Sequence, residues 1–198
     1  MFYVDSIWKL PCAFLFLGCL ASFAWGMKNF FVQPAGATRG MRITKLCSVF
    51  CSVLHFSLIL TSRTRPEEAQ FAVALYVLSL GLFWWAVHTN RAKPLSAVFS
   101  PDLPIHFVKR GPYRWVRHPF YTSYLLTWSA GVVASGRPWL ITSVIVMTFI
   151  YWKAARQEEA KFLRSALASV YANYRARTGL FAPSVLALIM HVRNVLSA

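Results

Sequence analysis

Residues 119–151 read PFYTSYLLTWSAGVVASGRPWLITSVIVMTFIY, an apolar stretch that is longer than one membrane crossing and is interrupted once. An α-helix needs about 20 apolar residues to cross the hydrocarbon layer. The interruption, SGRP at 135–138, is a typical turn sequence. Pro119 and Pro138 each suit the first turn of a helix, where the missing N–H has no partner within the helix. The stretch therefore predicts a hairpin of two short spans.

Three more apolar runs precede this hairpin: Ser6 to Met27, Thr44 to Ser62 and Gln70 to Thr89. Each is long enough to cross a bilayer as a helix. The first run resembles a secretory signal, but further apolar runs follow at once, so we expect it to be retained. The sequence thus predicts an all-α, polytopic membrane bundle of about five transmembrane helices.

The composition supports residence in a membrane. Hydrophobic residues make up 57% of the 198 residues and charged residues 14%, and the mean hydropathy is positive, which excludes an ordinary soluble domain. The formal net charge of +15 comes from Lys and Arg residues between the apolar runs, so anionic lipid headgroups are the expected partners and nucleic acid is not. The cysteines lie inside apolar runs and are expected to be buried free thiols that hold no metal: Cys12, Cys19, Cys47 and Cys51.

Lys and Arg residues concentrate in alternate loops. The segment between the first two spans and the connector between the third and fourth spans are both rich in them. By the positive-inside rule both segments should be cytoplasmic. With five spans, the amino terminus would lie outside and the carboxyl tail inside. A site built from the connector and the tail would therefore face the cytoplasm.

The connector from Arg91 to Arg117 is long for a link between two helices, and loops of that length are usually functional or disordered. It carries aromatic mass that a solvated linker lacks, and it leads into GPYRWVRHPFY at 111–121. Arg117 and His118 fall at the start of the fourth span, where free N–H groups and the helix dipole favour negative charge. Tyr121 follows His118 by three residues, so the two share one helix face. The alternative is a basic interfacial anchor, with the aromatic residues in the headgroup belt.

A second polar group, Arg156 with Glu158 and Glu159, comes just after the fifth span. Residues 155–174 carry apolar side chains at intervals of three and four, which predicts an amphipathic helix with Glu159 on its apolar face. A carboxylate on a buried face must find cations or hydrogen-bond donors. Its partner is either Arg156, one turn earlier, or a bound ligand. Glu158 points away from this face and could simply pair with Lys161 in solvent.

Together these motifs resemble the isoprenylcysteine carboxyl methyltransferases and the related phospholipid methyltransferases. The likeness rests on GPYRWVRHPFY at 111–121, on the group of Arg156 and two glutamates about forty residues later, and on YANY at 171–174. It covers roughly residues 75–183. We therefore expect a multispan helical enzyme.

The resemblance divides the chain into three parts. Residues 71–183 would form a methyltransferase-like catalytic core, residues 1–70 would add N-terminal transmembrane helices without family signal, and residues 184–198 would be an interfacial tail. The core would enclose a pocket for S-adenosylmethionine, closed by the connector and by the C-terminal amphipathic helix.

Carried over position by position, the resemblance also implies which residues hold the cofactor and the substrate. Arg117, His118 and Arg156 form the expected catalytic set: either arginine would orient the acceptor through paired hydrogen bonds, and His118 would donate a hydrogen bond to the cofactor. Val98 stands where the family has a polar residue, and a Gly-x-Gly element of the phospholipid enzymes is absent. The expected cofactor-binding residues are Ile105, His106, Phe107, Val108, Tyr113, His118, Pro119, Phe120, Tyr121, Glu158 and Glu159.

The resemblance implies methyl transfer from S-adenosylmethionine to a lipophilic acceptor within the bilayer. A carboxylate acceptor, as in isoprenylcysteine carboxyl methylation, is favoured over a lipid amine, because a carboxylate is ionised at neutral pH and needs no general base. Two other hypotheses stay open. One is a nicotinamide-dependent membrane reductase of the steroid-reductase type, and the other is a non-catalytic scaffold whose basic loops hold lipid headgroups.

Overall fold

The computed structural model describes residues 7–31, 39–61, 63–91 and 106–184. These residues are helical throughout, as predicted, apart from turns and one isolated bridge. The predicted interfacial tail lies almost wholly outside the described residues. The elements, in chain order, are α2 (Lys9–Asn29), α3 (Arg39–Thr61), α4 (Pro66–Thr89), η1 (Gly111–Arg114), α5 (Pro119–Ser135), η2 (Pro138–Leu140), α6 (Ile141–Leu163) and α7 (Ala168–Arg177).

Four of the helical segments are long and apolar enough to cross a membrane: α2, α3, α4 and the segment Pro138–Leu163, which joins η2 to α6. The expected fifth span, α5, has 17 residues and is about 25 Å long, less than the hydrocarbon thickness of about 30 Å. It ends because Gly136 takes the left-handed conformation, which favours glycine. The count of five spans therefore remains a prediction.

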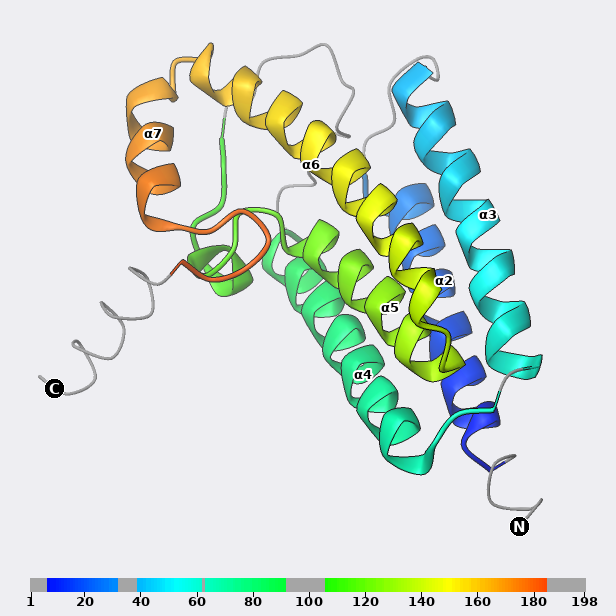
Figure 1. Ribbon diagram of the computed structural model, residues 1–198. Helices are drawn as coiled ribbons and strands as arrows, with labels where there is room; N and C mark the ends of the chain where they lie inside the picture. The colour runs from blue at the N-terminus through cyan, green and yellow to red at the C-terminus, as the bar shows by residue number, and fades with distance from the viewer. Residues whose placement is uncertain (1–6, 32–38, 62, 92–105, 185–198) are drawn as a thin grey trace, which may run out of the picture.

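α5 lies at the centre of the bundle, beside α4 and between α2, α3 and α6 (Figure 1). Small residues on α5, including Ala130, Gly131 and Ala134, let the neighbouring helices approach closely. Polar side chains also join the helices inside the apolar core. Ser79 of α4 donates to the Ser123 carbonyl at 2.6 Å, for example. The central position of α5 holds its first turn, which carries the candidate site, against two other helices.

His55 is the most deeply placed ionisable side chain of α3 and has no exposed surface. Its Nε2 lies 2.7 Å from the Ser143 hydroxyl of α6. That hydroxyl donates its own hydrogen to the Leu140 carbonyl, so the imidazole nitrogen must be the donor to Ser143. The other nitrogen, Nδ1, faces Gly131 of α5. His55 thus links α3, α5 and α6 through one side chain.

The amphipathic helix predicted at 155–174 is in fact two helices. α6 ends at Leu163, and α7 starts at Ala168 after a turn (Figure 1). The turn forms because Ser165 bonds to nearby backbone: its hydroxyl donates to the Phe162 carbonyl at 2.8 Å and accepts from the Leu167 N–H at 3.2 Å. Serine side chains compete in this way with helical hydrogen bonds. α7 consequently folds back to the end of the bundle where α5 begins.

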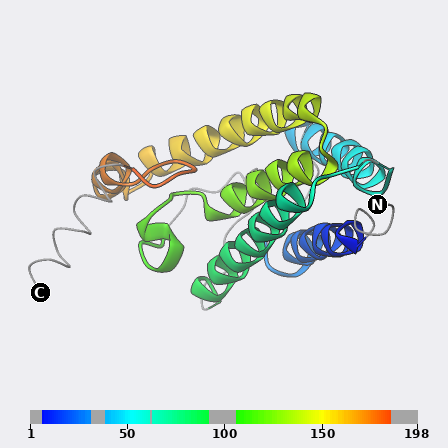
Figure 2. The same ribbon diagram turned by 60° about the horizontal axis from the view of Figure 1, so that its bottom comes forward.

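A short segment after α7, residues 178–184, crosses the start of α5, and we call it the strap. The N–H groups of Arg117 and His118 donate to the carbonyls of Gly179 and Leu180 at 2.8 and 3.2 Å. Thr122 adds a side-chain hydrogen bond to the Phe181 carbonyl at 2.9 Å. Figures 1 and 2 both show the strap lying beside the segment that contains η1. The strap therefore fixes the chain around His118.

The four cysteines are free thiols. Cys12, Cys19 and Cys51 are buried, as expected from the sequence, and Cys47 is half-buried.

Helix boundaries differ from the predicted ones mainly at the amino ends, since α3 and α4 start earlier than their apolar runs. α4 begins at Pro66, and the Glu68 side chain accepts a hydrogen bond from the Arg65 N–H at 3.4 Å. Such capping favours a helix start outside the apolar stretch.

Candidate active site

The Arg-His-Pro turn and the distant pair of glutamates meet in space. Arg117, at the start of α5, donates from Nε to Oε1 of Glu159 at 2.6 Å, across a separation of 42 residues. The same oxygen lies 3.5 Å from Nε2 of His118. Glu159 is only 1% exposed. Its carboxylate is therefore compensated by cations and donors, as a buried charge must be.

The second oxygen of Glu159, Oε2, lies between two more arginines. Arg175 Nε is 3.5 Å away and Arg156 Nη1 is 3.6 Å away. The predicted intrahelical pair with Arg156 therefore forms, but it is one of several ion pairs. Both distances exceed normal hydrogen-bond lengths, and among the described residues Oε2 has no hydrogen-bond partner. This oxygen can still accept a hydrogen bond.

Arg117 also ties three segments together. Its Nη1 donates to the carbonyl of Arg175 at 3.0 Å and to the carbonyl of Thr178. The guanidinium thus joins the start of α5 to the ends of α6 and α7. Because these hydrogen bonds engage two of its three nitrogens, the observed role of Arg117 is to hold Glu159 and the strap in place. A direct contact between Arg117 and an acceptor stays a prediction.

Glu158 has partners on and just before α5, besides the pairing with Lys161 that the sequence allows. The Tyr121 hydroxyl donates to Oε1 of Glu158 at 2.6 Å, and Oε2 of Glu158 lies 3.6 Å from Nδ1 of His118. Neighbouring helix positions normally point about 100° apart, but α5 packs so closely on α6 that its first turn reaches both glutamates. His118 consequently lies between two carboxylates, with one near each ring nitrogen.

The local arrangement of α5 agrees with the sequence. The rings of His118 and Tyr121 stack with centroids 5.6 Å apart, as residues three apart on one helix face should. Pro119 is the first residue of the helix and is buried, and Phe120 packs on the opposite side against Phe83. Of this turn, His118 and Tyr121 face the glutamates, while Phe120 supports the helix from behind.

The remaining predicted residues, at 105–108, lie in the connector. Phe107 packs against the rings of Phe162, Tyr171 and Tyr174, and so belongs to the contact between the connector and α7. Val108 packs beside Tyr113 in the cluster of α4 and α5. His106 has a buried Nε2 without a hydrogen bond among the described residues, and Ile105 lies outside them.

Tyr113 is held at three points. Its hydroxyl accepts a hydrogen bond from Asn90 Nδ2 at 3.0 Å, its carbonyl accepts one from the Tyr174 hydroxyl at 2.7 Å, and its ring is buried. Burial raises the pKa of Tyr113, and the hydrogen bond from Asn90 only partly offsets this rise. Asn90 was not among the predicted residues. The indication that the sequence does offer is the position of this polar residue, directly after the apolar run that ends at Thr89.

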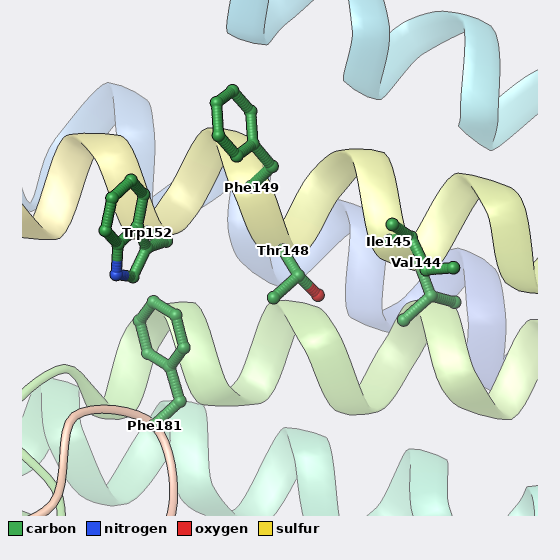
Figure 3. Close-up of a pocket in the computed structure, with 6 residues that line it drawn as sticks. All are labelled: Val144, Ile145, Thr148, Phe149, Trp152 and Phe181. Atoms are coloured by element: carbon green, nitrogen blue, oxygen red, sulfur yellow. The ribbon is translucent and has the colours of Figure 1, made fainter.

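An apolar groove of about 380 Å³ lies on the outer face of α6 (Figure 3). Phe181 of the strap forms one end of it, and the Phe181 ring is 6.3 and 6.2 Å from the rings of His118 and Tyr121. The groove is therefore adjacent to the charged centre, with Phe181 between them. Its other lining residues are Val144, Ile145, Thr148, Phe149 and Trp152. The predicted cofactor pocket around the charged residues stays a prediction.

The fold is a bundle of helices that are long enough to span a membrane. The site is a buried group of charged side chains at one end of this bundle. Within the described residues, no group of three His, Cys, Asp or Glu side chains is placed to hold a metal ion. Residues 67–170, from the start of α4 into α7, match the family model described as phospholipid methyltransferase. This match covers more than half of the chain, and the protein belongs to that family. No curated protein sequence matches the chain.

Membership confirms the resemblance seen in the sequence and identifies a family of methyltransferases that act on lipids. The match contains the Arg-His-Pro turn and both glutamates, and it leaves out α2, α3 and the strap. The strap nevertheless completes the site, since it contacts both Arg117 and His118.

Proposed function

We propose that this protein transfers a methyl group from S-adenosylmethionine to a lipophilic acceptor in the membrane. The observation that carries the proposal is the position of His118 between Glu158 and Glu159 in a member of a methyltransferase family. A histidine with a carboxylate near each ring nitrogen, buried beside arginines, is a centre for binding and orienting charged groups.

The residues present fit this cofactor. Oε2 of Glu159 and Nε2 of His118 are buried atoms without a hydrogen-bond partner in the described structure, and buried polar atoms of this kind usually serve a ligand or a catalytic role. The Glu159 carboxylate suits an ammonium group. Arg156, whose side chain is 47% exposed, and Arg175, at 33%, suit a carboxylate. These four residues would hold the amino-acid end of the cofactor.

Bound S-adenosylmethionine supplies a methyl group that its sulfonium already activates. The task of the protein is then proximity and alignment, which contribute about 7–11 kcal/mol to such reactions. Arg117 keeps Glu159 fixed, the strap keeps His118 fixed, and Phe181 separates the charged centre from the apolar groove. This division suits an acceptor with a polar head and an apolar body.

A carboxylate acceptor remains our first candidate, because it is ionised at neutral pH and needs no general base. A lipid amine is the second candidate, and a specific observation favours it. Glu158 faces His118 and Tyr121, so a carboxylate is available to accept the proton that an amine must lose. The amine is also the acceptor nearer to the description of the family.

Calorimetric titration of the detergent-solubilised protein with S-adenosylmethionine and with reduced nicotinamide dinucleotide tests the proposal. We expect binding of the former and none of the latter. Transfer of labelled methyl to a prenylated thioether acid or to an aminophospholipid then decides between the two acceptors. Binding of the nicotinamide alone supports the reductase hypothesis, and binding of neither supports the scaffold.

We further propose that the site faces the cytoplasm and that its basic rim contacts anionic lipid headgroups. The bias of Lys and Arg towards the connector supports this orientation. Labelling of a cysteine placed at Arg114, with a membrane-impermeant maleimide in right-side-out vesicles, tests it. No labelling until the vesicles are opened is expected, and labelling of intact vesicles contradicts it.

A further inference from the structure

The last residue before the connector, Asn90, carries a buried polar atom that has no hydrogen-bond partner among the described residues. Asn90 is 1% exposed, and its Oδ1 has no hydrogen-bond partner in the described parts of the chain. Leaving a buried acceptor unpaired costs about 1–3 kcal/mol. Such a cost is usually explained by a strained, catalytic or ligand-binding role.

The orientation of the Asn90 amide is fixed by its surroundings. Nδ2 donates to the Ala86 carbonyl at 2.7 Å and to the Tyr113 hydroxyl at 3.0 Å. The reverse orientation would place the amide oxygen against the Ala86 carbonyl, which is repulsive because both atoms are acceptors. Oδ1 is therefore the free atom of this amide.

The Tyr113 hydroxyl has one hydrogen to donate. Because Asn90 already donates to the Tyr113 oxygen, this hydrogen must point away from Nδ2. Tyr113 cannot turn easily, because its carbonyl is bound by Tyr174 and Gly111 brings the η1 turn into close contact with Thr89. In the described part of the chain, the end of α4 and the η1 turn thus present one donor without an acceptor, the Tyr113 O–H, and close to it one acceptor without a donor, Asn90 Oδ1.

An adjacent donor and acceptor match the edge of an adenine ring, which offers an N–H donor at its exocyclic N6 next to a ring-nitrogen acceptor. We propose that Asn90 Oδ1 and the Tyr113 hydroxyl bind the adenine edge of the nucleoside that carries the methyl group. This inference rests on the proposed function. It adds Asn90, which lies outside the predicted set, and it assigns Tyr113 to the base rather than to the amino-acid end of the cofactor.

The location agrees with the charged centre. Tyr174 of α7 donates to the Tyr113 carbonyl at 2.7 Å, and the next residue, Arg175, lies 3.5 Å from Glu159. The two glutamates and the amide-hydroxyl pair therefore lie near each other at the same end of the bundle. A nucleoside with a charged amino-acid arm can be held by the pair at one end and by Glu159, Arg156 and Arg175 at the other.

The test compares the binding of S-adenosylhomocysteine and S-inosylhomocysteine by calorimetry, and it needs no turnover. Inosine has a carbonyl in place of the exocyclic amine of adenine and an N–H at N1, so it reverses the hydrogen-bond pattern on the N1 edge and removes the donor on the N7 edge. We expect wild-type protein to bind the adenosyl compound at least about tenfold more tightly, which is the effect of about 1.4 kcal/mol. In Tyr113→Phe and Asn90→Asp this ratio should fall to within about threefold, because either change removes the fixed donor–acceptor pair.

Asn29 offers a matched control. It is the last residue of α2, and its Nδ2 donates to the Trp25 carbonyl four residues earlier at 3.1 Å, as Asn90 does to Ala86. Asn29→Asp makes the same change at a helix end, and it should leave the ratio unchanged. If Asn90→Asp does not fold, Tyr113→Phe decides, since it keeps the ring and removes only the hydroxyl.

Each outcome bears on the inference. A wild-type protein that binds both compounds equally, or a ratio that persists in Tyr113→Phe, overturns the adenine contact and leaves the proposed function intact. A wild-type protein that binds neither compound overturns both. A loss of the ratio in Asn29→Asp as well would show that the effect comes from the helix end and not from the pair.

Discussion

Arg117 donates from Nε to the Glu159 carboxylate over 2.6 Å, and this contact joins the chain just before α5 to the carboxyl end of α6. Both side chains are largely buried, with exposed fractions of 10% and 2%. The pair therefore supports the fold as well as the site. Its two partners come from the two motifs that define the family resemblance in the sequence.

Glu159→Gln should lower both stability and cofactor affinity. It leaves Arg117 buried without its counter-ion, and removing one partner of a buried ion pair costs about 3–5 kcal/mol. Thermal unfolding in detergent measures the effect, with Glu67→Gln, at the solvent end of α4, as a control that should change little. An unchanged melting temperature would show that the arginines find other partners.

Tyr121→Phe should separate the two acceptor hypotheses. The change removes the hydroxyl that donates to Glu158 at 2.6 Å, while the ring still stacks on His118 and on Tyr151. A hydrogen bond to a charged group contributes about 1.5–3 kcal/mol. If Glu158 accepts a proton from an amine, the rate of transfer should fall about tenfold and its pH profile should shift. With a carboxylate acceptor, the pH profile of the transfer rate should keep its shape. The shape of this profile, and not the size of the rate, therefore distinguishes the two acceptors.

Gly131→Ala should destabilise the bundle by about 1–3 kcal/mol, the usual cost of overpacking a core. A methyl group at this position would overlap the Nδ1 atom of His55, which Ser143 holds in place. Gly81→Ala in α4 is the matched control, because a methyl group there meets no atom within 4 Å. We expect a lower unfolding temperature for the first variant only. Equal melting of both would mean that His55 can move aside.

The buried tyrosines predict a loss of stability at alkaline pH. Burial raises the pKa of Tyr174, and nearby Arg117 only partly opposes this rise. The unfolded side chain ionises near pH 10, so the unfolded state gives up its proton first. The stabilisation is complete below pH 10 and is lost as the pH rises from there towards the folded pKa.

Tyr174→Phe should therefore reduce the slope of unfolding free energy against pH above pH 10, by up to about 1.4 kcal/mol per pH unit. The variant also loses the hydrogen bond to the Tyr113 carbonyl, which lowers stability by about 1 kcal/mol at every pH. Chemical unfolding between pH 8 and 11 measures both effects. A slope equal to that of wild type would show that Tyr174 ionises without unfolding.

Local features of the site could be predicted from the sequence because they depend on few residues. The turn at 135–138, the helix start at Pro119 and the stacking of His118 on Tyr121 all follow from neighbouring positions. The approach of Arg117 to Glu159 could be expected only from the family resemblance, since it depends on how α5 packs on α6 over 42 residues.

Other features required the structure. Helix periodicity places Glu158 off the apolar face, but the first turn of α5 lies close enough to bind it. The break at Ser165 was missed because apolar spacing continued across it. Apart from the polarity of the two residues, nothing in the sequence around Arg175 or Asn90 indicates that they belong to the site. Their roles come from contacts between segments that are far apart in sequence.

The strap is synthesised after the membrane-length helices, so the charged centre is completed late in the assembly of the protein. Arg117 and His118 donate to carbonyls at 179 and 180, which follow the four membrane-length helical segments found among the described residues. During synthesis the helices can therefore enter the bilayer before the segment that orients His118 has left the ribosome. A nascent chain that stops short of residue 178 would be inserted yet incompetent, and the enzyme would mature only after its membrane integration is finished.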